Sequence, residues 1–140
     1  MREILFRGKG TIDGEWKYGY YTGEVCKTPF SPTTKQDNII QLGSNLWCEV
    51  VPDTVGQFTG LTDENGTKIF EGDIIQTYDP DDGYAVVRYD DTETEFYADF
   101  VGDNVYYGLG ETFRNDDIEV IGNIYDNPEL IGGADYENTV

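Results

Sequence analysis

Residues 55–75 read VGQFTGLTDENGTKIFEGDII, and this segment carries the clearest strand and turn signals of the chain. Two short runs that favour strands, residues 57–59 and 68–70, flank the turn sequence Asp-Glu-Asn-Gly at 63–66. The Glu-Gly-Asp sequence at 71–73 precedes a third apolar run, where glycine accepts a tight turn and aspartate bonds to nearby backbone amides. The stretch predicts a β-hairpin followed by a tight turn into a further strand.

The chain before this stretch also has the period of strands. Residues 15–21 alternate aromatic and polar side chains, which places Trp16, Tyr18 and Tyr20 on one face of a strand. We expect Trp16 and Tyr18 to pack in the interior or in a subunit interface. Residues 27–45 contain two prolines and several small polar residues, and they predict a long loop with at most one short strand.

The chain after the stretch continues as short strands at regular spacing. Residues 72–78 and 84–89 predict two strands joined by Pro-Asp-Asp-Gly at 80–83, in which the Asp-Gly pair is typical of a hairpin. Further strands are expected at residues 95–100, 104–107 and 118–125. No segment combines a helical apolar period with caps at both ends, so helix should be minor. Short strands at this spacing suggest a small barrel.

Three blocks of the sequence together resemble the YopX family. The first is residues 55–75, the second is the N-terminal pair of motifs at 4–8 and 14–19, and the third is EVIGNIYDNPE at 119–129. The resemblance implies a β-rich architecture with an SH3-like barrel, and some members of the family form homo-oligomers. Members are mostly small phage and prophage proteins of unknown role, with no family catalytic motif to carry over. Residues 79–117 match only loosely.

The expected fold is therefore mainly β, an SH3-like barrel with an N-terminal β-hairpin extension and minor helix. We expect an N-terminal hairpin and loop region at 1–49, the barrel core at 50–126 and an acidic tail at 127–140, with the first two sharing one core. The motif residues receive structural roles in turns and strands: Gly56, Thr59, Gly60, Asp63, Gly66, Glu71, Gly72, Asp73, Gly122 and Asn123.

Charge is unevenly distributed over the 140 residues, which carry a net charge of −19. Residues 1–35 hold six basic and four acidic residues, a balance of +2. The remaining three basic and 24 acidic residues give residues 36–140 a balance of −21. Such a field repels nucleic acid and acidic membrane surfaces, so we expect neither as a direct partner. The N-terminus has no signal-peptide pattern and no window resembles a membrane span, so we expect a cytoplasmic location in the host bacterial cell.

The sequence also excludes several catalytic chemistries. There is no histidine, which removes the commonest general base and metal ligand and makes Ser-His and Cys-His pairs impossible. The only serines, Ser31 and Ser44, are not in nucleophile elbows, and no phosphate-binding loop is present. We interpret Cys48 as a buried core thiol rather than as half of a disulfide with Cys26 or a reactive thiol. Among 28 acidic residues, a carboxylate pair suited to glycoside hydrolysis stays possible by composition.

Two acidic turns, at residues 63–66 and 79–83, resemble the start of a calcium-binding loop. Neither has the glycine and glutamate spacing of an EF-hand loop, so we interpret both as turns. We accordingly assign no catalytic, cofactor-binding or metal-binding residues and expect no cofactor.

One acidic segment offers a candidate interaction surface. Asp91, Glu93 and Glu95 alternate along a predicted strand, which would project their carboxylates from one face at ~6.7 Å intervals. Such a row could imitate backbone phosphates. The preferred interpretation is a charged edge strand that resists aggregation.

The expected function is that of a non-enzymatic phage or prophage accessory protein that acts through protein–protein contacts. It is expected to form a homo-oligomer, and a host or phage protein is a candidate partner. The basic and acidic segments offer an electrostatic basis for head-to-tail contacts. The alternative is an acidic nucleic-acid mimic that inhibits a host DNA-binding protein.

Overall fold

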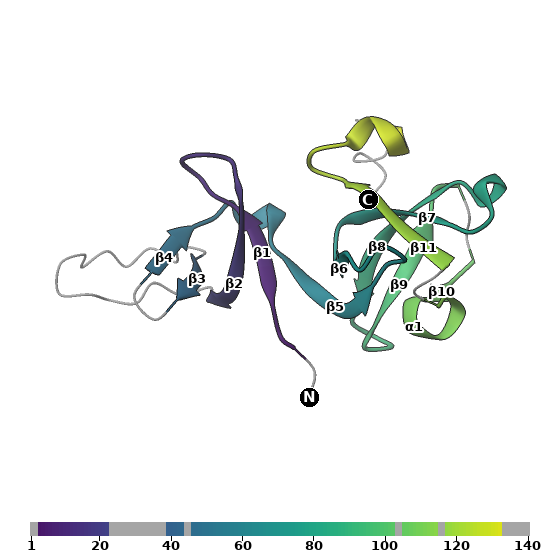
Figure 1. Ribbon diagram of the computed structural model, residues 1–140, viewed down its shortest axis with the longest axis horizontal. Helices are drawn as coiled ribbons and strands as arrows, with labels where there is room; N and C mark the ends of the chain where they lie inside the picture. The colour runs from purple at the N-terminus through teal and green to yellow at the C-terminus, as the bar shows by residue number, and fades with distance from the viewer. Residues whose placement is uncertain (1–2, 23–38, 44–45, 103–104, 115–116, 133–140) are drawn as a thin grey trace. The chain divides into compact units, whose positions relative to one another are not determined.

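The computed structural model divides the chain into two compact units, Met1–Phe58 and Thr59–Val140 (Figure 1). Each unit is described by itself. The structure describes residues 3–22, 39–43, 46–102, 105–114 and 117–132.

The first unit is an antiparallel meander of four strands: β1 (Phe6–Lys9), β2 (Trp16–Thr22), β3 (Ile39–Gly43) and β4 (Leu46–Glu49). β1 pairs with β2 on one side and with the beginning of β5 (Gly56–Thr62) on the other. The 3₁₀ turn η1 (Pro52–Thr54) is fixed to β1, because the Thr54 hydroxyl oxygen accepts the Lys9 N–H at 2.9 Å.

The second unit contains a five-stranded antiparallel sheet in the order β10-β9-β8-β7-β11. Its strands are β7 (Asp73–Thr77), β8 (Tyr84–Asp90), β9 (Glu95–Phe100), β10 (Tyr107–Gly108) and β11 (Ile118–Asn123). β5 pairs with β6 (Lys68–Phe70), and this pair belongs to the other sheet. Among the residues of this unit that the structure describes, helix is limited to short pieces: η2 (Pro80–Asp82), α1 (Leu109–Thr112) and η4 (Pro128–Ile131).

The central strands of this sheet are buried on both faces, as their apolar runs require. Alternation along β7 sends Ile75 into one apolar cluster and Ile74 into another. The first cluster contains Ile69, Ile75, Ala85, Val87, Ala98, Phe100, Leu109 and Ile118. The second contains Ile74, Val86 and Ile131.

The prediction of a mainly β fold with little helix is confirmed. β2, β7, β8 and β9 lie where the alternation and the turn sequences predict them, whereas no pattern in the sequence predicts α1. A closed SH3-like barrel stays a prediction; the second unit presents a five-stranded sheet together with the β5–β6 hairpin.

The unit boundaries differ from the expected ones for a physical reason. The division falls between Phe58 and Thr59, inside β5, because the beginning of β5 pairs with β1 and its end pairs with β6. The expected acidic tail begins too early, since Ile131 is buried in the second apolar cluster. Residues 133–140 lie outside the described residues.

The aromatic face of β2 corrects a second expectation. Tyr18 is 47% exposed and Tyr20 is 67% exposed, so packing in the interior is wrong for Tyr18. Trp16 is half-buried, with the Arg7 guanidinium 4.5 Å from its ring centroid. Alternation places side chains on one face but does not supply a layer to cover them. Packing in a subunit interface stays a prediction.

Candidate functional site

The Asp63 carboxylate accepts three backbone hydrogen bonds in the second unit. It is 2% exposed, and its Oδ1 accepts the N–H groups of Asn65 at 2.9 Å and Thr67 at 2.8 Å. Its Oδ2 accepts the N–H of Val120, 57 positions away, at 2.9 Å. One carboxylate therefore closes the β5–β6 turn and fixes that turn to β11.

Three glycines and a threonine of the motif shape the strands around this turn. The Thr59 hydroxyl donates to the carbonyl of Ile69 at 2.8 Å and so joins β5 to β6. Gly60 and Gly66 have positive φ angles of 89° and 79°. Gly56 is buried opposite Arg7 in the pairing of β5 with β1. These positions serve backbone geometry in the described fold.

The turn between β6 and β7 contains Glu71, Gly72 and Asp73. Gly72 has φ +92°, and a Cβ there would lie 3.2 Å from the Tyr125 ring, so other residues would be strained on two counts. Asp73 is buried, and its Oδ2 accepts the Phe70 N–H at 2.7 Å. Glu71 is half-buried in the same turn.

Gly122 and Asn123 perform a similar function at the end of β11. The Asn123 Oδ1 accepts the N–H groups of Tyr125 at 3.0 Å and Asp126 at 2.9 Å. A Cβ on Gly122 would lie 2.5 Å from the Asn127 Oδ1. The ten motif residues thus lie in turns and strand pairings spread over both units, and they do not converge on one reactive centre.

The acidic candidate surface does not have the predicted geometry. β8 ends at Asp90 and β9 begins at Glu95, so Asp91 and Glu93 lie in the turn between them and not on a strand. The Asp90 Oδ1 accepts the Thr92 N–H at 2.8 Å, and Thr94 has φ +53°, which turns the chain back. The regular row of three carboxylates is therefore wrong, because a side-chain-capped turn interrupts the strand.

The Glu95 side chain instead makes contacts within its own chain. Its Oε1 accepts the Tyr106 hydroxyl at 2.6 Å, and its carboxylate packs beside Gly108. Desolvation is the larger cause, and this hydrogen bond the second, of a pKa of the Tyr106 hydroxyl above its usual value.

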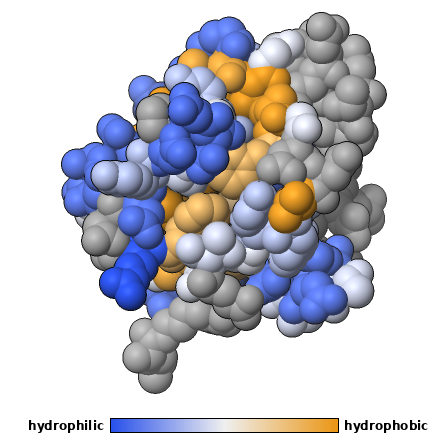
Figure 2. Space-filling view, turned by 90° about the vertical axis from the view of Figure 1, so that its right-hand side faces the viewer, coloured by the Kyte–Doolittle hydropathy of each residue, from blue (hydrophilic) through white to orange (hydrophobic). Residues whose placement is uncertain are grey.

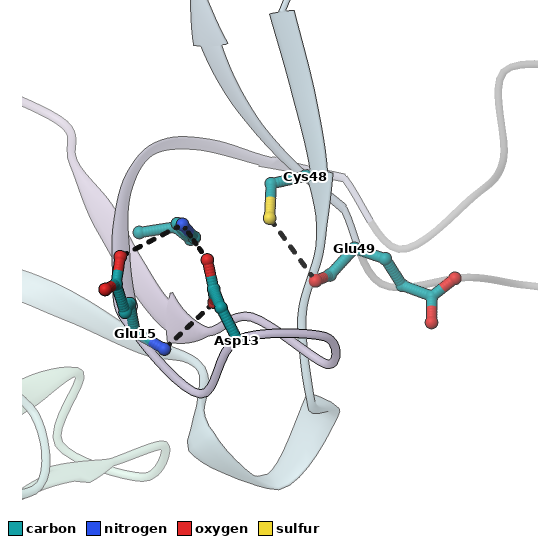
Figure 3. A network of polar contacts seen from close by, with 5 residues as sticks. Asp13, Glu15, Cys48 and Glu49 are labelled. Carbon is teal, nitrogen blue, oxygen red and sulfur yellow. Dashed lines mark hydrogen bonds and ion pairs between the residues drawn. The ribbon is translucent and has the colours of Figure 1, made fainter.

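The first unit has a polar network around Lys17 (Figure 3). The Lys17 ammonium lies 2.7 Å from the Asp13 carboxylate and 3.8 Å from that of Glu15. The hydrogen bond from Lys17 lowers the pKa of Asp13, and the same bond raises the pKa of Lys17. Lys17 therefore forms an ion pair with Asp13.

Figure 3 also shows the sulfur of Cys48, which a dashed line joins to Glu49. Its thiol donates to the carbonyl of Glu49 at 3.5 Å, and the residue is only partly buried. The prediction of a buried core thiol is wrong, because β4 leaves this position partly open. Cys26 lies outside the described residues.

The described residues contain no group of three or more histidine, cysteine, aspartate or glutamate side chains that could hold a metal ion. A hollow of about 280 Å³ is lined in part by Glu64, Asp117 and Glu119, together with the exposed ring of Tyr78. No helix within the described ranges is long and apolar enough to cross a membrane.

Comparison with known proteins places the chain in a family. The model of the family described as YopX protein matches residues 6–132. The structure is similar to the crystal structure of protein EF1440 from Enterococcus faecalis, with 25% identity and a TM-score of 0.55, covering 94% of this chain and 99% of that chain. It also matches the crystal structure of protein yopX from Bacillus subtilis, with 20% identity and a TM-score of 0.49, covering 96% and 99%. Among curated proteins, none matches. Because the family model spans nearly the whole sequence, the chain belongs to the YopX family.

Proposed function

We propose that this YopX-family protein is a non-catalytic accessory protein of a phage or prophage that binds other proteins and associates with itself. The observation that carries the proposal is the exposure of tyrosine side chains on β2, at Tyr18 and Tyr20. Tyrosine is enriched in protein interfaces because its ring offers a large contact area and its hydroxyl bonds to polar groups.

The polar residues support a non-catalytic role. Asp63, Asp73 and Asn123 hold backbone groups, and Lys17 is bound to Asp13. The chain has no histidine that could act as a general base. These roles support a binding protein rather than an enzyme.

The described basic side chains favour aromatic contacts over head-to-tail charge pairing as the basis of self-association. Arg7 is buried with its guanidinium near the Trp16 ring, Lys9 lies 5.5 Å from the same ring centroid, and Lys17 is ion-paired. These cations are already engaged within one chain. Aromatic association of chains with net charge −19 should strengthen as salt screens their repulsion.

Light scattering on paired variants tests the proposal. The double variant Tyr18→Ser/Tyr20→Ser should lower the average mass at a concentration where the wild type associates. Tyr78→Ser is the matched control, because it removes an 87% exposed tyrosine that does not belong to β2. A wild type that stays monomeric at high concentration and high salt would refute self-association. An equal effect of both variants would refute the assignment to β2.

A further inference from the structure

The second unit has a hollow of about 270 Å³ that none of the motif residues lines. Its lining consists of Asp81, Asp82, Phe100, Tyr107 and Phe113. On the face of the molecule seen in Figure 2, hydrophobic residues lie at the top and in the centre, with hydrophilic residues along the left side.

Strand register explains why these residues meet. Phe100 ends β9 opposite Ala85 of β8, so it lies close to the β7–β8 turn that carries Asp81 and Asp82. Tyr107 begins β10 opposite Ala98 of β9. Phe113 follows α1 directly, and its N–H donates to the Leu109 carbonyl at 3.4 Å.

The three rings form one aromatic group. The centroid of Phe100 lies 5.3 Å from that of Tyr107, at an interplanar angle of 78°, and 6.2 Å from that of Phe113. The rings of Tyr107 and Phe113 are 6.3 Å apart. Phe100 is 5% exposed and belongs to the main apolar cluster, which fixes one wall of the hollow to the core.

The two carboxylates differ in their hydrogen bonds with the rest of the chain. The Asp82 Oδ2 accepts the Thr77 hydroxyl at 3.3 Å. The Asp81 carboxylate makes no hydrogen bond or ion pair with any described residue, and no described cation pairs with Asp82. The hollow thus combines aromatic rings with negative charge that the described part of the chain leaves uncompensated.

Rings and carboxylates together select organic cations. Cations are attracted to the negative faces of aromatic rings, and carboxylates add a direct charge interaction. The volume falls below the range of ~300–1,000 Å³ typical of drug-sized ligands, so it suits a single side chain. Guanidinium fits better than ammonium because its plane stacks on rings and its N–H groups pair with carboxylates.

We propose that the hollow lined by Asp81, Asp82, Phe100, Tyr107 and Phe113 receives an arginine side chain of a partner protein. The inference rests on the proposed function in that a protein supplies the cation. It goes further by naming the chemical group that is bound and the residues that bind it.

The first test uses Nα-acetyl-arginine amide as the probe and Nα-acetyl-citrulline amide as its uncharged match, followed by NMR of the aromatic ring resonances. The arginine probe should shift the rings of Tyr107 and Phe113 saturably, with a dissociation constant on the order of millimolar. The citrulline probe should produce no saturable shift. Equal responses to the two probes, or no response to either, would overturn the proposal.

Variants then assign the binding to these residues. Asp81→Asn should weaken binding of the arginine probe about 2- to 5-fold, as expected for one exposed ion pair. Phe113→Leu, which keeps apolar volume but removes the ring, should also weaken it about 2- to 5-fold. Asp91→Asn is the matched control, because it removes the same charge from an exposed turn and should leave affinity unchanged. An unchanged affinity in Asp81→Asn, or an equal loss in the control, would refute the site.

The outcome is separable from that of the proposed function. If the protein stays monomeric but binds the arginine probe at this hollow, the site is supported and self-association is refuted. If the protein associates but does not bind the probe, self-association is supported and the site is refuted. If Asp81→Asn also dissociates the oligomer, a second copy supplies the arginine; if it does not, another protein does.

Discussion

Replacing Asp63 with asparagine should destabilise the second unit strongly. Asp63 is 2% exposed, and its two oxygens accept three backbone N–H groups at 2.8–2.9 Å. Asparagine retains one acceptor oxygen and turns an NH₂ group toward at least one of these donors. That substitution loses a hydrogen bond to a charged group and leaves a part-buried N–H without an acceptor.

The magnitude follows from those two losses. A hydrogen bond to a charged group contributes about 1.5–3 kcal/mol, and an unsatisfied buried donor costs about 1–3 kcal/mol. Because the two figures describe overlapping parts of one loss, we expect Asp63→Asn to lower the free energy of unfolding by about 2–4 kcal/mol. Asp63→Ala should cost more, since all three N–H groups lose their acceptor.

Urea denaturation followed by circular dichroism measures this change. Asp91→Asn is the control, because Asp91 is exposed in a turn and its substitution should change stability by less than about 0.5 kcal/mol. If Asp63→Asn unfolds within about 0.5 kcal/mol of the wild type, the argument from its three backbone bonds is refuted.

Three further predictions follow from the same structure. Gly72→Ala should lower the free energy of unfolding by about 1–2 kcal/mol, because φ is +92° there; an unchanged urea midpoint would contradict this. Lys17→Met should return the lowered pKa of Asp13 toward its ordinary value of 3.8, as measured by NMR titration. The stabilising contribution of that pair is present above the ordinary pKa and lost as pH falls; an unmoved Asp13 pKa in the variant would show that Lys17 is not its cause. The double variant Asp91→Asn/Glu93→Gln should capture the same partner proteins as the wild type. Its stability should be equal or slightly higher, because like charges repel. Loss of a specific partner protein with an intact fold would instead support nucleic-acid mimicry.

Much of the fold could be predicted from alternation and turn chemistry. Residues 72–78 and 84–89 are apolar runs separated by an Asp-Gly turn, and the structure has β7 and β8 there as an antiparallel pair. These signals are local, so a sequence can display them without knowledge of the tertiary fold. α1 was missed because a four-residue helix has no measurable apolar period.

The candidate surfaces depended on information that is not local. The alternation of Asp91, Glu93 and Glu95 imitates a strand, but the Asp90 side chain caps a turn at this point. Asp63 has a recognisable turn sequence, whereas its bond to Val120 joins residues 57 positions apart and depends on the completed sheet. The aromatic hollow likewise requires the register of β8, β9 and β10.

Sedimentation of the wild-type protein over a salt series measures whether the chains associate through their exposed aromatic side chains. The series should run from about 0.05 to about 0.5 M salt, over which the screening length falls severalfold. We predict a mass above that of the 15.8 kDa chain that increases with salt, since screening relieves the repulsion between chains of net charge −19. A mass that decreases toward that of the monomer as salt rises, or a monomer at every salt concentration, would contradict association through exposed aromatic side chains.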